Sequence, residues 1–378
     1  MKPLENLIVL EFCQYMSGPS AGLRLADLGA RVIKIERPDI GDSGRQLAVK
    51  DLFIGGNSIL FHTINRNKES YAANLKDQTD LEKIKKLILK ADILIHNFRP
   101  KVMEKLGLGF EDIQLLNPRL IYAEISGYGK KGPWKKKPGQ DLLLQSISGL
   151  TWLSGDKSAP PIPFGLSIAD YMCGTHLTQG ILAALIKRNK TKLGSLIEVN
   201  LLSTLIDFQF EVITTYLNDG GKLPQRAENG NAHAYLSAPY GIYKTLDGYL
   251  VVAMENLEYL GKNIDLIEIK NFVKENFSQR DKVMEMLQSH FQLKTTKHWL
   301  LLLESAKIWC AGVLNYHQFL NHNGFKVLNM TQEISLPNQQ KIITTRCPIR
   351  IDGEKYFSKK PGPILGENTF SIDEEIFH

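Results

Sequence analysis

The carboxylate of Asp170 stands where an apolar segment ends and a long helical pattern begins. The segment starts at Pro163, and a small-residue turn with Gly174 follows the carboxylate. A carboxylate presented at such a corner can attack an activated acyl group. The same residue type is also a common helix N-cap, and it could simply cap a helix beginning at Tyr171. The residues alone leave both roles open.

A second carboxylate, Asp141, follows Gln140 and precedes the apolar run 142–147. It also has the context of a helix N-cap. Gln140 cannot exchange a proton near neutral pH, so it is unsuited to general base catalysis. Its amide could orient an acyl group through hydrogen bonds, or it could be a solvated loop side chain.

Apolar runs and helix-spaced apolar patterns alternate along the first two hundred residues. The predicted strands cover residues 7–12, 31–36, 91–96, 120–125 and 196–200, and the predicted helices cover 19–28, 80–89, 110–116, 170–187 and 201–216. This alternation is typical of an α/β domain with a parallel sheet.

The first strand, helix and second strand resemble a dinucleotide-binding unit. Glu36 ends the second strand, where an acid that binds ribose would lie. The intervening turn holds Gly18 and Gly22 but lacks the G-x-G-x-x-G signature, which argues against NAD. The helix N-terminus at this turn still favours an anion.

Composition excludes several classes of protein. The 378 residues suit two domains, and the net charge of +6 is spread without a dense basic block, so no nucleic-acid partner is expected. The four cysteines form no CxxC pair, so we expect no metal site and no disulfide framework. No apolar run reaches the length of a membrane span, and no signal peptide is visible. We therefore expect a cytoplasmic protein without a membrane partner.

The character of the chain changes after a plausible linker at 219–224. A hairpin is predicted around Asp247 and Gly248, mostly helical material follows to about residue 320, and short strands and turns are expected from residue 340.

Many ordered motifs resemble the family III CoA-transferases, also called the CaiB/BaiF family, which includes formyl-CoA transferase. The matching segments are 18–19, 25–30, 32–38, 41–42, 65–68, 91–92, 97–100, 106–109, 117–122, 126–129, 138–141, 145, 148–149, 168–170, 238–241, 247–248 and 363–368. An ordered series over such a span is more specific than any single motif.

The resemblance implies a fold and an assembly. It implies a Rossmann-like large domain built from both chain ends, residues 1–200 and 335–378, with a linker at 201–225. A smaller α+β domain with its return linker would occupy 226–334. Two copies would form an interlocked, ring-like homodimer.

The resemblance also implies a reaction. Asp170 matches the family's nucleophilic aspartate, which takes acyl and CoA groups in turn through an anhydride and an aspartyl-CoA thioester. The substrates would be an acyl-CoA and a small carboxylic acid, with no tightly bound cofactor. The racemase branch carries a histidine where this chain has Gln140, so α-proton abstraction is disfavoured. A racemase or isomerase, or a non-catalytic CoA-binding homologue, remain the alternatives.

Several polar and aromatic residues match or adjoin the family's CoA-binding positions. Arginine and lysine suit the phosphates of CoA, with Lys68 among the cations considered. At 105 the family's arginine is replaced by lysine, which puts that contact in doubt. The loop around His233 has fewer glycines than the lid of formyl-CoA transferase, and His233 is given no catalytic role. The expected CoA-binding residues are Gln14, Tyr15, Met16, Ser17, Arg37, Asn74, Lys76, Asn97, Phe98, Arg99, Lys105, Tyr128 and Gln140.

Overall fold

The computed structural model describes residues 2–377 and divides them into two compact units. Unit 1 comprises residues up to 144, 167–208 and from 329 onward, and unit 2 comprises 145–166 and 209–328. Each unit has its own sheet and its own buried core. The domain boundaries given in the sequence analysis stay predictions.

Unit 1 is built on a six-stranded parallel sheet, so the α/β prediction is confirmed. The spatial order of its strands is β5-β2-β1-β6-β7-β8. The strands are β1 (Ile8–Phe12), β2 (Arg31–Glu36), β5 (Glu69–Ala72), β6 (Ile93–His96), β7 (Ile121–Ser126) and β8 (Ser195–Asn200). Five of them match the predicted strands, and β5 was missed.

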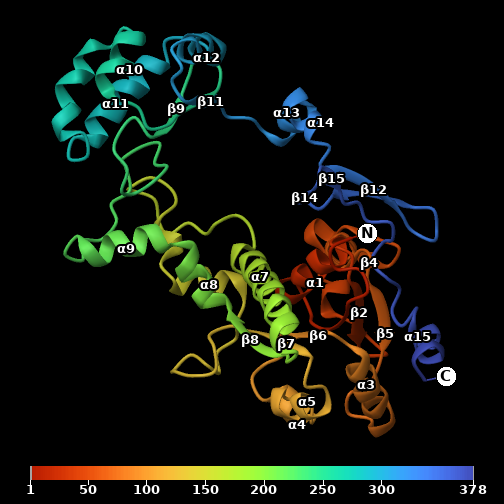
Figure 1. The fold of residues 1–378 in the computed structure, drawn as a ribbon. Coiled ribbons are helices and arrows are strands. Elements are labelled where there is room, and N and C mark those ends of the chain that lie inside the picture. The colour runs from red at the N-terminus through yellow and green to blue at the C-terminus, as the bar shows by residue number, and fades with distance from the viewer. Residues whose placement is uncertain (1, 378) are drawn as a thin grey trace. The chain divides into compact units, whose positions relative to one another are not determined.

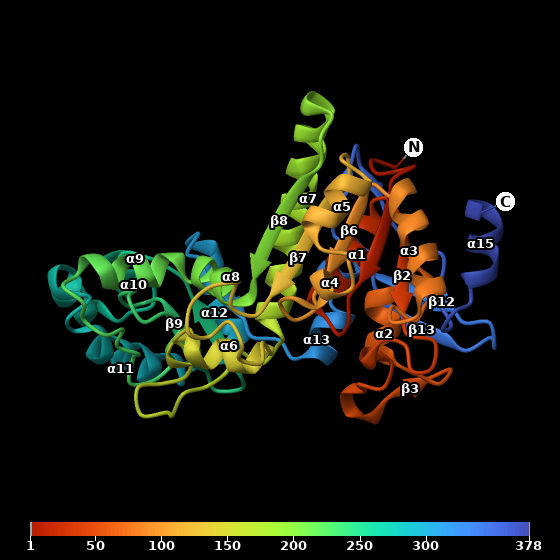
Figure 2. The same cartoon turned by 90° about the horizontal axis from the view of Figure 1, so that it is seen from below.

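Helices cover both faces of this sheet (Figures 1 and 2). On one face α1 (Ser17–Asp27) packs against α7 (Ile168–Thr191). On the other face the buried side chains of α3 (Gln78–Lys90) and α5 (Phe110–Leu116) share a core with Leu10 and Phe12 of β1. Alternate residues of β1 point to opposite faces. Glu11 therefore lies on the α1 face, a placement that matters for the site below.

The remaining elements of unit 1 are short. They are η1 (Ser43–Arg45), η2 (Val49–Asp51), β3 (Phe53–Ile54), β4 (Asn57–Ser58), α2 (Ile59–Asn65), α4 (Val102–Lys105), α6 (Asp141–Ile147), α8 (Leu201–Phe208), β12 (Thr331–Ser335), β13 (Lys341–Thr345), β14 (Arg350–Ile351), β15 (Glu354–Lys355) and α15 (Thr369–Phe377). The last residues of α6 belong to unit 2. The C-terminal end of the chain adds the hairpin β12–β13 and helix α15 to this unit.

Unit 2 holds a three-stranded antiparallel sheet of order β11-β10-β9. Its hairpin joins β9 (Gly241–Lys244) to β10 (Tyr249–Val252), which confirms the turn predicted around Asp247. The other elements are η3 (Leu150–Trp152), α9 (Phe210–Asn218), α10 (Leu257–Asn263), η4 (Ile267–Glu275), α11 (Arg280–Phe291), α12 (Thr296–Ser305), β11 (Cys310–Gly312), α13 (Tyr316–Asn321) and α14 (Asn323–Leu328).

Candidate functional site

The strand order of unit 1 reverses between β1 and β6, which are neighbours in the sheet. The chain moves outward from β1 to β2 and β5 on one side, and through β6, β7 and β8 on the other. Ligands of open parallel sheets bind at the carboxyl ends of the strands at such a switch point. The loops that follow β1 and β6 meet there. Asn97 donates to the Gln14 carbonyl at 2.7 Å, and the Gln14 N–H donates to the Asn97 amide oxygen at 3.0 Å.

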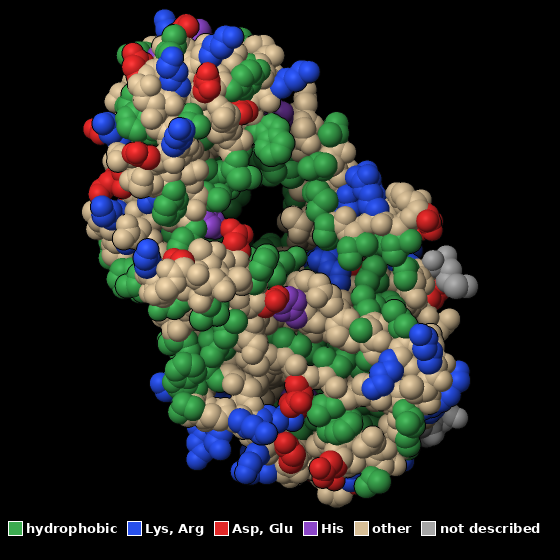
Figure 3. Space-filling view, turned by 60° about the vertical axis from the view of Figure 1, so that its left-hand side comes forward, with side chains coloured by type: hydrophobic (Ala, Val, Ile, Leu, Met, Phe, Trp, Pro, Cys, Tyr) green, Lys and Arg blue, Asp and Glu red, His purple; other side chains and the backbone are tan. Residues whose placement is uncertain are grey.

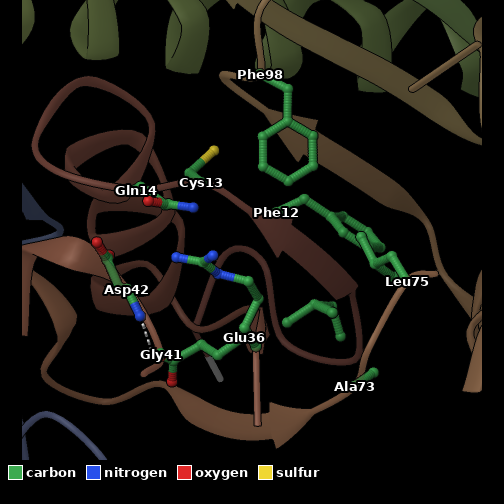
Figure 4. A pocket seen from close by; sticks show the side chains of 11 residues that line it. Phe12, Cys13, Gln14, Glu36, Gly41, Asp42, Ala73, Leu75 and Phe98 are labelled. Carbon is green, nitrogen blue, oxygen red and sulfur yellow. Dashed lines mark hydrogen bonds between the residues drawn. The ribbon is translucent and has the colours of Figure 1, made fainter. Parts of the chain in front are cut away.

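A pocket lies at this carboxyl edge (Figure 4). Three of the predicted CoA-binding residues line it, namely Gln14, Arg37 and Phe98. The ring of Phe98 faces the Phe12 side of the pocket, with Gln14 and Asp42 across from it (Figure 4). The full lining is Phe12, Cys13, Gln14, Ile35, Glu36, Arg37, Gly41, Asp42, Ala73, Leu75 and Phe98. The strand ends thus give it an apolar wall and a polar wall.

A buried lysine fixes the first loop of this pocket from below. Lys34 is fully buried, and its ammonium lies 2.8 Å from Asp42 and 3.0 Å from Glu11. It also donates to the carbonyl of Cys13 at 2.7 Å. Burial alone would lower the pKa of Lys34, but the charges of Glu11 and Asp42 raise it, so the lysine stays charged.

Asp42, which pairs with Lys34, also binds the backbone of the loops around the pocket. Its other oxygen accepts the N–H of Tyr15 at 3.1 Å and that of Gly44 at 2.7 Å. Tyr15 has a φ of 65°, a left-handed conformation that a residue other than glycine adopts at a cost. The hydrogen bond from Tyr15 to Asp42 helps to hold this conformation. The sequence places Asp42 in the matching segment 41–42 but does not show its role, because Lys34 and Tyr15 lie on other segments.

Lys68 does not belong to the ligand rim that the sequence analysis considered. Its side chain is fully inaccessible, and its ammonium lies 2.7 Å from Glu11 and 2.8 Å from the Pro19 carbonyl. Burial lowers its pKa to about 8, although Glu11 opposes that shift. The expectation was wrong because the lysine sits under α1 and supports it.

Asp170 lies in the first turn of α7, which begins two residues before it at Ile168. The alternative that Asp170 caps a helix beginning at Tyr171 is therefore wrong. The Asp170 carboxyl is half-buried and accepts a hydrogen bond from the Ser17 side chain. Burial and the charge of Asp141 raise the pKa of Asp170 to about 6, while the Ser17 hydrogen bond opposes the rise.

Close packing between α1 and α7 brings Ser17 to this carboxyl. A Cβ added at Gly174 would lie 2.1 Å from the Ser20 hydroxyl and 2.6 Å from the Ser17 carbonyl oxygen. Only glycine allows α7 this close to the first turn of α1. The positive end of the α1 dipole therefore lies beside a carboxylate.

Asp141 is the first residue of α6, yet its carboxylate reaches α7. It accepts the N–H of Ala169 at 2.7 Å and that of Asp170 at 3.2 Å. The sequence indicated a capping residue here but not which helix it caps. Two carboxylates twenty-nine positions apart in sequence thus share one helix start.

The other predicted binding residues are distributed along the same sheet edge. Tyr128 follows β7, and its hydroxyl donates to the Pro138 carbonyl at 3.1 Å, which ties the two ends of the loop 128–138 together. Asn97, Met16 and Tyr128 are half-buried, and Ser17 is buried. The exposed members are Tyr15, Arg37, Asn74, Lys76, Arg99, Lys105 and Gln140.

The described residues, 2–377, hold no group of histidine, cysteine and carboxylate side chains able to bind a metal ion. Over the same residues, no helix is long and apolar enough to cross a membrane. Acidic and basic side chains are interspersed on the face drawn in Figure 3.

Residues 4–369 match the family model "CoA-transferase family III". Human succinyl-CoA:glutarate CoA-transferase is 32% identical, over all of this chain and 86% of that protein. Acetyl-CoA:oxalate CoA-transferase of Acetobacter aceti is 30% identical, over 99% of this chain and 96% of that protein. A CAIB/BAIF family protein from Brucella suis has a similar solved structure, with a TM-score of 0.83, 29% identity and 99% coverage of both chains.

Proposed function

Because the chain belongs to the family III CoA-transferases and is an enzyme of the transferase type, we propose that it moves CoA from an acyl-CoA to a small carboxylic acid through Asp170. The observation that carries the proposal is the setting of Asp170. It is a half-buried carboxylate in the first turn of α7, beside the N-terminus of α1, with a pKa of about 6. Such a group is ionised at neutral pH and poorly solvated, which favours nucleophilic attack.

The reaction needs two exchanges at Asp170. An oxygen of Asp170 attacks the thioester carbonyl of the donor, the C–S bond breaks, and CoA leaves as a thiolate from an acyl-aspartyl anhydride. The thiolate then attacks the aspartyl carbonyl, the anhydride C–O bond breaks, and the donor acid departs. Asp170 is left as a thioester of CoA.

The acceptor acid reverses these two exchanges. Its carboxylate attacks the aspartyl thioester and releases the thiolate, which attacks the acceptor carbonyl and frees Asp170. No proton is lost or gained, so the sequence requires no general base. Each tetrahedral centre gains stability from N–H donors, which the N-terminus of α1 could supply.

We assign CoA to the carboxyl edge of the sheet. Gln14 and Phe98 line the pocket there, and Arg37 lies at its rim, where a guanidinium can bind phosphate oxygens. The other predicted CoA-binding residues follow strands on the same edge and belong to the same proposal. The relatives' names pair succinyl-CoA with glutarate and acetyl-CoA with oxalate, so dicarboxylic acids are the first acceptors to test.

We also propose that the enzyme works as a homodimer. In the single chain, none of the nine residues of α9 is buried, although the helix carries large apolar side chains. Phe210 and Leu217 of α9 are 67% and 71% exposed, and Leu223, in the segment that follows the helix, is 76% exposed. Large apolar side chains this exposed and this close in sequence suggest a surface that a partner covers.

The direct test is to trap the acylated enzyme. Incubation with succinyl-CoA or acetyl-CoA and hydroxylamine should convert Asp170 to a hydroxamate, detected by mass spectrometry of the peptide that contains it. Asp170→Ala should lose the adduct and at least a thousandfold of the transfer rate, roughly the size expected for a nucleophile. Near-normal transfer by Asp170→Ala would refute the mechanism. Exchange of the α-proton with deuterium, without transfer to an acid, would instead favour a racemase.

A further inference from the structure

Helix α7 begins without a capping side chain of its own. Ser167 occupies the N-cap position, but its side chain makes no capping hydrogen bond. The first N–H groups of a helix have no partner within the helix. Here Asp141, from the start of α6, accepts two of them, at Ala169 and at Asp170 itself. Asp141 is only 5% exposed, so this carboxylate is a buried part of the helix start.

We propose that Asp141 is a positioning residue for Asp170, which it holds by capping the turn that carries it and activates through its negative charge. The inference rests on the proposed function, because it concerns Asp170 as the nucleophile. It assigns to Asp141 no contact with the substrate.

The capping bonds fix the direction of the Asp170 backbone. The N–H of Asp170 is itself one of the two donors, so a change at Asp141 acts on the nucleophile's own peptide group. Orientation of a reacting group within a fraction of an ångström contributes strongly to rate. The positive end of the α7 dipole in turn stabilises the buried Asp141 carboxylate.

The charge of Asp141 acts on the Asp170 carboxyl as well. Burial is the largest cause of the raised pKa of Asp170, the charge of Asp141 adds to it, and Ser17 from α1 opposes it. On α7 itself, Cys173 is buried, and burial raises its thiol pKa, so it faces Asp170 as a neutral group. The next ionisable pair along α7 is His176 with Asp207 of α8, whose nearest nitrogen and oxygen lie 3.3 Å apart. Asp141 is therefore the charge that most affects this carboxyl.

A raised pKa benefits a carboxylate nucleophile. A more basic carboxylate attacks a thioester faster, provided that it is ionised at the working pH. At about 6, Asp170 meets both conditions near neutral pH. Loss of the Asp141 charge should leave Asp170 ionised but less reactive.

The test titrates Asp170 directly in the resting protein. Aspartate labelled with carbon-13 at the carboxyl is incorporated, and the Asp170 signal is assigned by its absence in Asp170→Asn. Asp141→Asn keeps an oxygen for the cap and removes the charge. The matched control is Asp77→Asn, since Asp77 caps α3 by accepting the N–H groups of Thr79 and Asp80.

We expect Asp141→Asn to lower the pKa of Asp170 by about half a unit to one unit, because burial remains as the larger cause. Asp77→Asn should leave it unchanged. In transfer assays, the acidic limb of the pH–rate profile should shift to lower pH by the same amount as the NMR titration. The rate above pH 7 should fall severalfold. Asp141→Ser, an uncharged capping residue, should give the same shift and provides a second variant if the first does not fold.

An Asp170 titration that is the same in wild type and in folded Asp141→Asn would overturn the proposal. An equal shift in Asp77→Asn would overturn it too, since the effect would then not be specific to Asp141. Failure of the proposed function looks different. In that case wild-type enzyme forms no adduct on Asp170, while the NMR titration still reports whether Asp141 acts on it.

Discussion

Asp170 combines a reactive charge with a position that disfavours that charge. Its pKa is raised from an ordinary 3.8 to about 6 in the folded chain. Between these values the folded state holds a proton that the unfolded state has released. The free energy of unfolding must therefore fall as pH rises from about 4 to about 6. The nucleophile destabilises the fold at the pH where it is ionised.

Replacement of Asp170 by asparagine should accordingly stabilise the protein near neutral pH. We expect Asp170→Asn to raise the free energy of unfolding by about 1 to 2 kcal/mol at about pH 7.5, after allowance for solvent screening of a half-buried group. The gain should nearly disappear at about pH 3.5, below the ordinary pKa of 3.8, because Asp170 is then largely protonated in both the folded and the unfolded state. Urea unfolding of both proteins at the two pH values measures this. Equal gains at both would show that the charge is not responsible.

At the scale of elements, the approach of α1 to α7 determines whether Ser17 reaches Asp170. Gly174→Ala would place a methyl group against Ser20 and the Ser17 carbonyl, where backbone must move. We expect the free energy of unfolding to fall by about 1 to 3 kcal/mol, the usual cost of overpacking. We also expect kcat to fall by a larger factor than KM changes. Gly165→Ala is the matched control, because its Cβ would meet nothing within 4 Å. A fully active Gly174→Ala enzyme would contradict this account.

The regular elements could be predicted because their periodicity is local. Strands β1, β2, β6, β7 and β8 are short, mainly apolar runs, and the first four are mostly buried, whereas β8 at the edge of the sheet is only partly buried. Strand β5 was missed because its sequence, Glu69 to Ala72, contains two polar residues in four. One of them, Ser70, is buried through a hydrogen bond to Glu36, a partner on another strand.

The candidate site could be predicted less completely, because its determinants are not local. Asp170 was identified from its motif, but its place within α7 depends on a cap from Asp141. Lys34 resembles an ordinary polar position in a strand, and only the fold brings Glu11 and Asp42 to it. Lys68 was expected to contact a ligand because the sequence does not show that Glu11 and the Pro19 carbonyl bind its ammonium. A sequence shows which residue types are present, whereas partners from other elements decide what they do.

At the scale of the whole molecule, the exposed apolar side chains are consistent with the proposed homodimer, in which a second copy of the chain would cover them. Figure 3 shows apolar side chains over much of the face it draws. Beyond Phe210, Leu217 and Leu223, the single chain also exposes Ile206 and Phe208 of α8, at 47% and 38%. Burial of each such group would contribute roughly 1.5 to 3 kcal/mol toward association, against the entropy lost when two chains are joined.

The dimer can be tested through these side chains without touching the catalytic carboxyl. Sedimentation of the wild-type protein should give twice the chain mass of 42.6 kDa down to micromolar concentration. Replacing Phe210, Leu217 and Leu223 together by glutamine should shift the mass toward that of one chain. Leu115→Gln is the control, since Leu115 of α5 is 87% exposed but stands alone in its helix as a highly exposed apolar residue. A monomeric wild type would contradict the dimer, and a triple variant as dimeric as the control would show that these three side chains do not hold the two copies together.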